Sequence, residues 1–83
     1  MKKYQIILSK PAQKFLLRQE RTRQERLLKA IYKLPHEGDV RALSGQNDIY
    51  RLRIGDYRAI FFIEQHVLLV NILNIGNRGD VYK

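Results

Sequence analysis

Three arginines in one alternating segment are the residues of this sequence best suited to phosphate chemistry. Residues 50–58 read YRLRIGDYR, so cations alternate with apolar residues before a Gly-Asp pair. Such alternation is typical of a half-buried strand, which puts Arg51 and Arg53 on one face. A guanidinium is planar and always charged, and its fork of donors matches the oxygens of a phosphate. The segment therefore predicts a surface for a polyanion.

The Gly55-Asp56 pair predicts a two-residue hairpin turn between two strands. In that register Ile54 faces Tyr57, and Arg53 faces Arg58. Like charges directly opposite each other destabilise a sheet. Arg51 or Arg53 alone would be read as an ordinary solvent-facing residue, because most charged side chains lie outside. The pairing with Arg58 favours a bound ligand instead. Tyr50 and Tyr57 fall on the apolar face and are expected in the core.

The charge of the whole chain has the same sign. Its 83 residues include 16 Lys and Arg against 8 Asp and Glu, a formal net charge of +8. That excess points to nucleic acid or an acidic partner. A chain of this length is expected to form one domain, covering residues 1–83.

Several classes of protein are excluded or disfavoured by composition. The chain has no cysteine, which excludes a disulfide framework and any cysteine-based metal site or nucleophile. His36 and His66 have no companion at ligand spacing, so neither a metal nor another cofactor is expected. The apolar run of residues 6–8 is too short for a secretory signal, and no stretch is long enough to span a bilayer. A cytoplasmic protein is expected.

The first half of the chain predicts a strand followed by two helices. Residues 4–8 are short, apolar and suited to a strand. Ser9 is a candidate N-cap with Pro11 in the first turn of a helix. A second helix carries an apolar stripe made by Leu27, Leu28, Ile31 and Leu34. Thr22, with Glu25 three residues on, is its candidate cap, and Pro35 ends it.

The second half predicts an antiparallel sheet. Residues 40–48 are expected to be mostly irregular, with Leu43 reaching the core. Strands are expected at 49–54, 57–64 and 67–75, with a turn at Gln65-His66, a loop at 76–80 and a short tail. Strands that follow one another and helices that precede them indicate an α+β fold, with both helices on one face of a small antiparallel sheet.

Three motifs in this order resemble RelE-type toxins of bacterial toxin–antitoxin systems: YRLR at 50–53, GDYR at 55–58, and IGNRGDVYK at 75–83. The resemblance covers essentially the whole chain. It implies a RelE-like fold, a ribosome-dependent messenger-RNA endonuclease, and a co-expressed antitoxin with an acidic or amphipathic segment. Messenger and ribosomal RNA in the ribosomal A site would be the other partners. The residues at the family's functional positions are Arg51, Arg53, Arg58, Arg78 and Tyr82.

The implied chemistry suits these residue types. Cleavage of RNA through its own 2′-hydroxyl needs a phosphate held in line, stabilised negative charge, a proton acceptor and a proton donor. The resemblance assigns phosphate binding to Arg51 and Arg53, and catalysis to Arg58, Arg78 and Tyr82. Well-known members carry lysine where this chain has Arg51 and Arg53, and arginine is a poor base. Tyr82 therefore becomes the candidate base. Many relatives have histidine in place of Asn77, which leaves charge stabilisation to Arg78.

A second basic surface follows the predicted helices. Lys10, Lys14 and Arg18 repeat at helical spacing, and further cations follow in the second helix. Such a run is usually a solvated face, and like charges as neighbours cost a few tenths of a kcal/mol, roughly. In a chain of this charge we expect a contact with ribosomal RNA. Two other functions stay open: a non-enzymatic inhibitor of DNA gyrase of the ParE type, and a plain basic RNA-binding module. The arginine and tyrosine set favours the enzyme.

Overall fold

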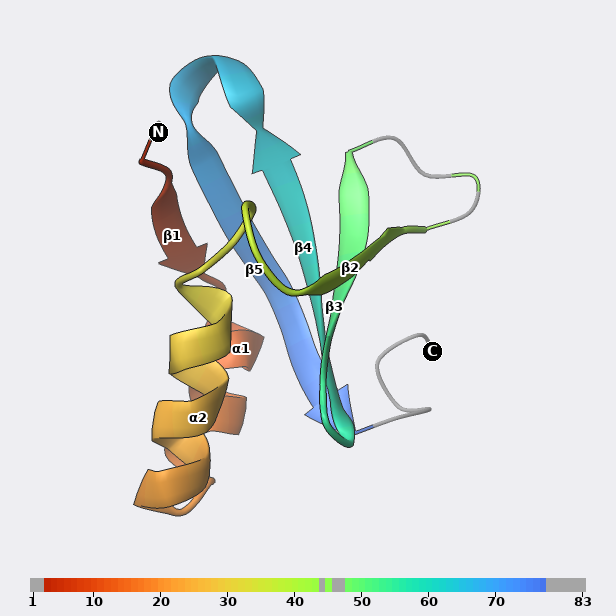
Figure 1. The fold of residues 1–83 in the computed structure, drawn as a ribbon. Helices are drawn as coiled ribbons and strands as arrows, with labels where there is room; N and C mark the ends of the chain where they lie inside the picture. The colour runs from red at the N-terminus through yellow and green to blue at the C-terminus, as the bar shows by residue number, and fades with distance from the viewer. Residues whose placement is uncertain (1–2, 44, 46–47, 78–83) are drawn as a thin grey trace.

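The fold is a five-stranded sheet with two helices on one of its faces (Figure 1). The computed structural model describes residues 3–43, 45 and 48–77. The strand order is β1-β5-β4-β3-β2, with β1 parallel to β5 and the other neighbours antiparallel. The elements in chain order are β1 (Gln5–Leu8), α1 (Lys10–Leu17), α2 (Arg21–Ile31), β2 (Asp39–Ala42), β3 (Ile49–Ile54), β4 (Tyr57–Glu64), the 3-10 helix η1 (Gln65–Val67) and β5 (Leu69–Asn77).

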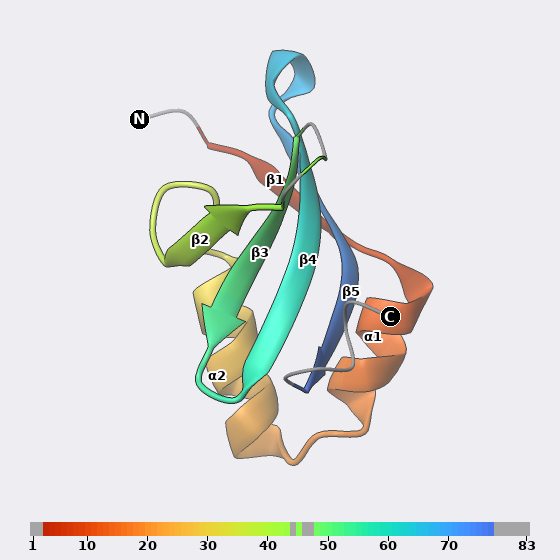
Figure 2. The same ribbon diagram turned by 90° about the vertical axis from the view of Figure 1, so that its right-hand side faces the viewer.

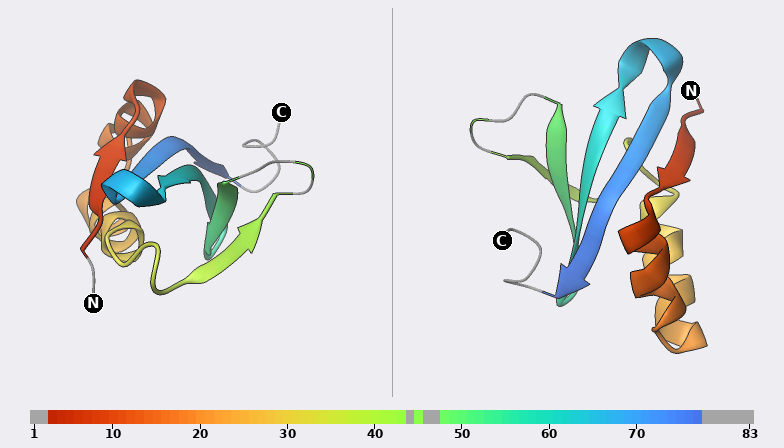
Figure 3. Two further views of the ribbon diagram at one scale, coloured as in Figure 1. Left: turned by 90° about the horizontal axis from the view of Figure 1, so that it is seen from above. Right: turned by 180° about the vertical axis from the view of Figure 1, so that it is seen from behind.

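The α+β class and the helical layer on one face are confirmed, and the view from behind shows the same two layers (Figure 3). The sheet is mixed, because β1 adds to the antiparallel strands in parallel to β5. None of the described helices is long and apolar enough to cross a membrane.

Helix α1 begins where the sequence predicts. The Ser9 hydroxyl accepts a hydrogen bond from the Ala12 amide at 3.2 Å and donates one to the Leu73 carbonyl at 2.8 Å. One side chain therefore caps the helix and ties its start to β5. Pro11 lies in the first turn, and Ala12 and Leu16 are buried against the sheet.

Helix α2 begins earlier than predicted, and the capping role of Thr22 is wrong. Its N-cap is Glu20, which makes no side-chain cap bond. The Gln24 side chain donates to the Leu16 carbonyl at 2.9 Å, which fixes the connection from α1 in place of a cap. Glu25 pairs with Arg21 at 3.3 Å instead of closing a capping box. The apolar stripe is confirmed, since Leu27, Ile31 and the following Leu34 are buried.

Strand β2 was not predicted, because residues 40–48 were expected to be irregular. It pairs with β3 in antiparallel register at the edge of the sheet. Its four residues, DVRA, alternate polar with apolar residues, but they include a single β-branched residue and are mostly exposed, so the pattern is too short and too weak to mark a strand. Leu43 is only half-buried and is not among the buried core residues.

The β3–β4 hairpin has the predicted register. Ile54 pairs with Tyr57 and Arg53 with Arg58, and Gly55 takes a φ of +59° in the turn. That backbone angle favours glycine. The next connection differs slightly, because η1 and Leu68, with φ +55°, precede β5. Strand β5 therefore starts at Leu69 and continues to Asn77, two residues beyond its predicted end.

The core lies between the helices and one face of the sheet. Its most deeply buried large side chains are Phe61, Leu27, Ile31, Leu52, Ile72 and Val70. Tyr50 stacks on Phe61 with ring centroids 5.6 Å apart, and Tyr57 meets Phe15 edge-on at 5.8 Å. Both tyrosines are packed against the core as predicted. The other sheet face, turned away from the helices in Figure 2, carries the alternate residues.

Candidate functional site

The predicted arginines lie together on the sheet face away from the helices. Arg53 and Arg58 are direct cross-strand partners, and Arg51 is two residues from Arg53 on the same strand. Neighbouring strands lie about 4.8 Å apart and alternate residues about 6.8 Å apart. The three guanidinium groups can therefore reach one phosphate or two adjacent ones.

Arg58 is partly buried without a hydrogen-bond partner, among the described residues, for one of its guanidinium nitrogens. The residue is half-buried, and its Nη1 nitrogen is buried without a hydrogen-bond partner in the described part of the chain. None of Arg51, Arg53 and Arg58 forms an ion pair with another described residue. An unsatisfied buried donor costs roughly 1–3 kcal/mol, more for a charged group. Arg58 therefore gains most from a ligand that brings an anionic oxygen.

Strand β2 adds two residues to this face that the sequence pattern did not predict. Arg41 pairs with Arg51, and Asp39 pairs with Arg53, so both side chains belong to the same face. We call Arg41, Arg51, Arg53 and Arg58 the arginine face. The signal for Arg41 was present in the alternation of Asp39 and Arg41 with apolar residues. It was too short to show a strand, because only two of the four residues are apolar.

The turn that joins β3 to β4 is held from the helical side. The rings of Tyr57 and Phe15 make a T-shaped contact, and the Arg23 guanidinium carbon lies 5.8 Å from the centroid of the Tyr57 ring. The Arg26 guanidinium lies against Gly55, where an added Cβ would come within 2.7 Å of Nη2. The residues that flank Arg53 and Arg58 are thus braced by side chains of both helices.

The helical residues that were predicted to contact ribosomal RNA line a groove between α1 and β5. Lys10, Lys14 and Arg18 line a hollow of about 390 Å³ together with Phe15, Asn74 and Ile75. All three cations are exposed. The groove is therefore open to an anionic backbone, as a contact with RNA requires.

Two of the predicted catalytic residues, Arg78 and Tyr82, lie outside the described residues, and their placement relative to the arginine face stays a prediction. Among residues 3–43, 45 and 48–77 no group of three or more histidine, cysteine or acidic residues is placed to hold a metal ion. His36 meets the ring of Tyr4 edge-on at 5.8 Å, and His66 is exposed in η1. The described residues of the arginine face can bind and polarise a phosphate. Proton transfer needs another group.

Comparisons with known proteins agree with this architecture. Residues 6–82 match the family described as the ParE toxin of type II toxin–antitoxin system, parDE. The structure of an archaeal RelE–RelB complex from Pyrococcus horikoshii is 30% identical, with a TM-score of 0.76, and the match covers 96% of this chain and 100% of that one. No curated protein sequence matches the chain.

Two more distant structures share the fold. The RelBE2 toxin–antitoxin complex of Mycobacterium tuberculosis is 17% identical with a TM-score of 0.78, covering 93% of this chain and 100% of that one. The isolated RelE toxin of E. coli is 22% identical with a TM-score of 0.74, covering 95% and 90%. The family match and the fold agree: this chain belongs to the RelE/ParE toxin superfamily and is the toxin of a type II toxin–antitoxin system.

Proposed function

We propose that this toxin is a ribosome-dependent messenger-RNA endonuclease that cleaves through the RNA 2′-hydroxyl. The observation that carries the proposal is the arginine face, above all the pair Arg53–Arg58 with its buried, unpartnered Nη1. A gyrase inhibitor with no chemistry of its own has no need for a charged donor buried at a cost. An enzyme that stabilises a pentacoordinate phosphate does.

In the proposed reaction the 2′-oxygen attacks the adjacent phosphorus and the bond to the 5′-oxygen breaks. The products are a 2′,3′-cyclic phosphate and a 5′-hydroxyl end. Arg51 and Arg53 hold the phosphate in line, and Arg58 stabilises the charge that develops on its oxygens. The family resemblance adds Tyr82 as the group that takes the proton from the 2′-hydroxyl. Arg78 neutralises the charge on the leaving 5′-oxygen, which takes a proton from water to become the 5′-hydroxyl.

We also assign the toxin a cognate antitoxin. RelB accompanies RelE in the related Pyrococcus complex. On this chain, an apolar groove of about 300 Å³ lies between α1 and α2 on their outer side, lined by Leu16, Leu17, Leu28 and Tyr32. Leu17 is 77% exposed and Tyr32 61%. An amphipathic segment that buries these side chains, and offers acidic residues to the exposed Arg18 and Lys33 that follow them in the chain, fits this surface.

The proposal is tested by inducing the toxin in bacteria and mapping the 5′ ends of one transcript in a translated and an untranslated form. Cleavage within codons of the translated copy alone, leaving 5′-hydroxyl ends, is expected. Equal cleavage of both copies would show that cleavage does not depend on the ribosome. Intact transcripts in growth-arrested cells would show that the toxin is not a messenger-RNA endonuclease.

Inhibition of DNA gyrase is the alternative that one observation favours, because the matching family is described as the ParE toxin. A supercoiling assay with purified gyrase decides between the two. The endonuclease proposal expects no inhibition at toxin concentrations that stop translation. Loss of supercoiling activity, together with intact messenger RNA, would show that the toxin is a gyrase inhibitor of the ParE type.

A further inference from the structure

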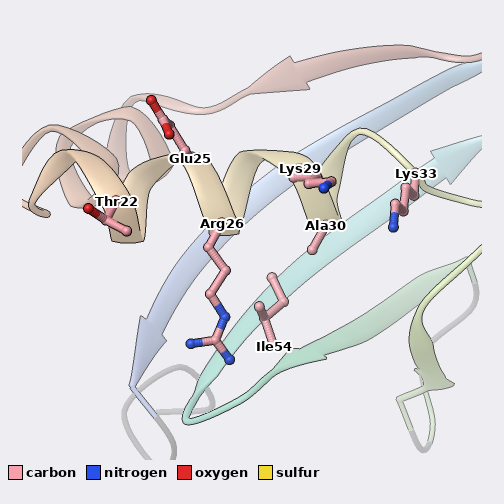
Figure 4. A pocket seen from close by; sticks show the side chains of 7 residues that line it. All are labelled: Thr22, Glu25, Arg26, Lys29, Ala30, Lys33 and Ile54. Atoms are coloured by element: carbon pink, nitrogen blue, oxygen red, sulfur yellow. The ribbon is translucent and has the colours of Figure 1, made fainter.

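A second basic groove, separate from the arginine face, runs along α2. It has a volume of about 530 Å³. Figure 4 shows Arg26 reaching from α2 toward the turn between β3 and β4, with Lys29 farther along the helix and Lys33 just beyond its end. The residues that line it include Thr22, Glu25, Arg26, Lys29, Lys33 and Ile54. The three cations are exposed, and none of them forms an ion pair with a described residue.

The single acidic residue of the groove is already neutralised. Glu25 accepts a hydrogen bond from Arg21 Nε at 3.3 Å, on the helix surface. The charge that remains in the groove is therefore that of Arg26, Lys29 and Lys33. Groups of like charge this close repel one another, and an anion that lies along the groove relieves that repulsion.

We propose that the Arg26–Lys29–Lys33 groove binds the phosphate backbone of single-stranded RNA. The inference deepens the proposed function and rests on it for the identity of the RNA. With a rise of 1.5 Å per residue, Lys29 lies about 4.5 Å along the helix axis from Arg26, and Lys33 follows in the turn after the C-cap Tyr32. The cations thus follow a line, as a backbone with one charge per nucleotide requires, and do not converge on one point.

An acidic protein segment is a weaker occupant of this groove. A peptide that docks on a helix gains most of its affinity by burying apolar side chains. The large exposed apolar residues of the helical layer, Leu17 and Tyr32, lie in the other groove, between α1 and α2. The Arg26–Lys29–Lys33 groove offers only Ala30 and Ile54. Helix α2 therefore separates a side suited to protein from a side suited to phosphate.

The position of the groove links it to the arginine face. Its Arg26 end abuts Gly55, the turn residue between Arg53 and Arg58. A side chain at Gly55 would collide with the guanidinium, so the backbone of the turn and the cation are in close approach. An RNA strand that leaves the groove at this end passes the hairpin tip and arrives at the arginine face. The groove would hold nucleotides next to those that are cleaved.

The test is a titration of the 83-residue chain with a fluorescent, fully 2′-O-methylated single-stranded RNA, which binds but offers no 2′-hydroxyl to cleave. Anisotropy is measured over a series of salt concentrations. K29Q/K33Q should bind more weakly, and the slope of log affinity against log salt should become shallower by about 1.4, since each contact contributes about 0.7. K29R/K33R keeps the charges and should keep the slope.

The matched control is a variant that lowers the net charge by the same amount at a site far from the groove. Q65E/H66E also lowers the formal charge by two, in exposed residues of η1, at the end of β4 opposite the Gly55 turn (Figure 1). It should leave the slope near that of the wild type. The inference is wrong if K29Q/K33Q keeps the wild-type slope, or if the control flattens it as much. It is also wrong if K29Q/K33Q loses binding to a poly-glutamate peptide while RNA binding is unchanged.

The outcome can be told apart from that of the proposed function. If K29Q/K33Q shows the shallower salt slope but the toxin never cleaves a translated messenger, the groove binds RNA and the proposed endonuclease activity is wrong. If the toxin cleaves the messenger but K29Q/K33Q keeps the wild-type slope, the endonuclease proposal holds and the groove does not bind RNA. Thermal unfolding of each variant checks that the exposed substitutions leave the fold intact.

Discussion

The sheet and the helical layer both carry an excess of cations, but they hold them differently. On the arginine face the cations stand on paired strands; Arg41 and Arg53 are exposed, but Arg51 and Arg58 are half-buried, and one nitrogen of Arg58 has no partner among the described residues. On α1 and α2 the cations are exposed at the ends of long side chains. Fixed, partly desolvated charges favour a transition state, whereas exposed charges mainly attract a polyanion. We infer that the sheet performs the chemistry and the helices provide affinity.

Arg58→Met tests most strongly whether the sheet performs the chemistry, because it keeps an aliphatic side chain and removes the guanidinium. Growth arrest should be lost, because a single such electrostatic group is worth about two to three orders of magnitude in rate. Stability should rise by about 1 kcal/mol, since a buried donor without a partner disappears. Urea unfolding measures the second effect. A less stable but fully toxic variant would contradict both roles of Arg58.

The roles assigned to the two terminal residues are tested by Arg78→Ala and Tyr82→Phe. Each should lower messenger cleavage by about two orders of magnitude, because one removes charge stabilisation and the other a proton relay. Primer extension on ribosome-bound messenger measures the breaks, and co-sedimentation with ribosomes should be nearly unchanged. Full cleavage by Tyr82→Phe would mean that another group takes the proton, and Asp39, opposite Arg53, would be the next residue to change.

The helical side of the comparison is tested by replacing Lys10, Lys14 and Arg18 together with glutamine. Affinity for ribosomes should fall and depend less on salt, with a slope shallower by about 2, because fewer counterions are released. Sedimentation at several salt concentrations measures this. Wild-type salt dependence would show that the groove beside α1 does not contact RNA.

The smallest expected effect concerns the link between the two layers. Ser9 caps α1 and bonds to the Leu73 carbonyl of β5. Ser9→Ala should reduce the free energy of unfolding by about 1 kcal/mol. Since Ser9 does not lie on the arginine face, cleavage by the folded variant should be normal. A large loss of cleavage without a loss of stability would place catalytic residues on the helical side.

Local patterns predicted the parts of this molecule in which short-range chemistry decides the structure. The alternation around Arg51 and Arg53 and the Gly55 turn were enough for the hairpin register, because a glycine turn and one apolar face fix the pairing. Ser9 was recognised as a cap for the same reason.

The remaining features depend on contacts that are distant in the chain. Strand β2 forms because β3 offers it an edge, so its own four residues carry almost no signal, and Arg41 was missed with it. Helix α2 starts at Arg21 although Thr22 and Glu25 suit a capping box, since Gln24 bonds to Leu16 across the helix connection. The cations of α2 were part of the basic surface expected to contact ribosomal RNA, but their groove beside the hairpin could not be predicted, because only the fold brings Arg26 to Gly55.

The most direct test of the division between sheet and helices is a single-turnover measurement. Preformed complexes of ribosome and messenger are saturated with wild type, Arg58→Met, or the Lys10/Lys14/Arg18 glutamine variant, and the cleavage rate is followed. We expect a rate about 100- to 1,000-fold lower for Arg58→Met and a wild-type rate for the helical variant. A wild-type rate for Arg58→Met, with a large loss for the helical variant at saturation, would contradict the account.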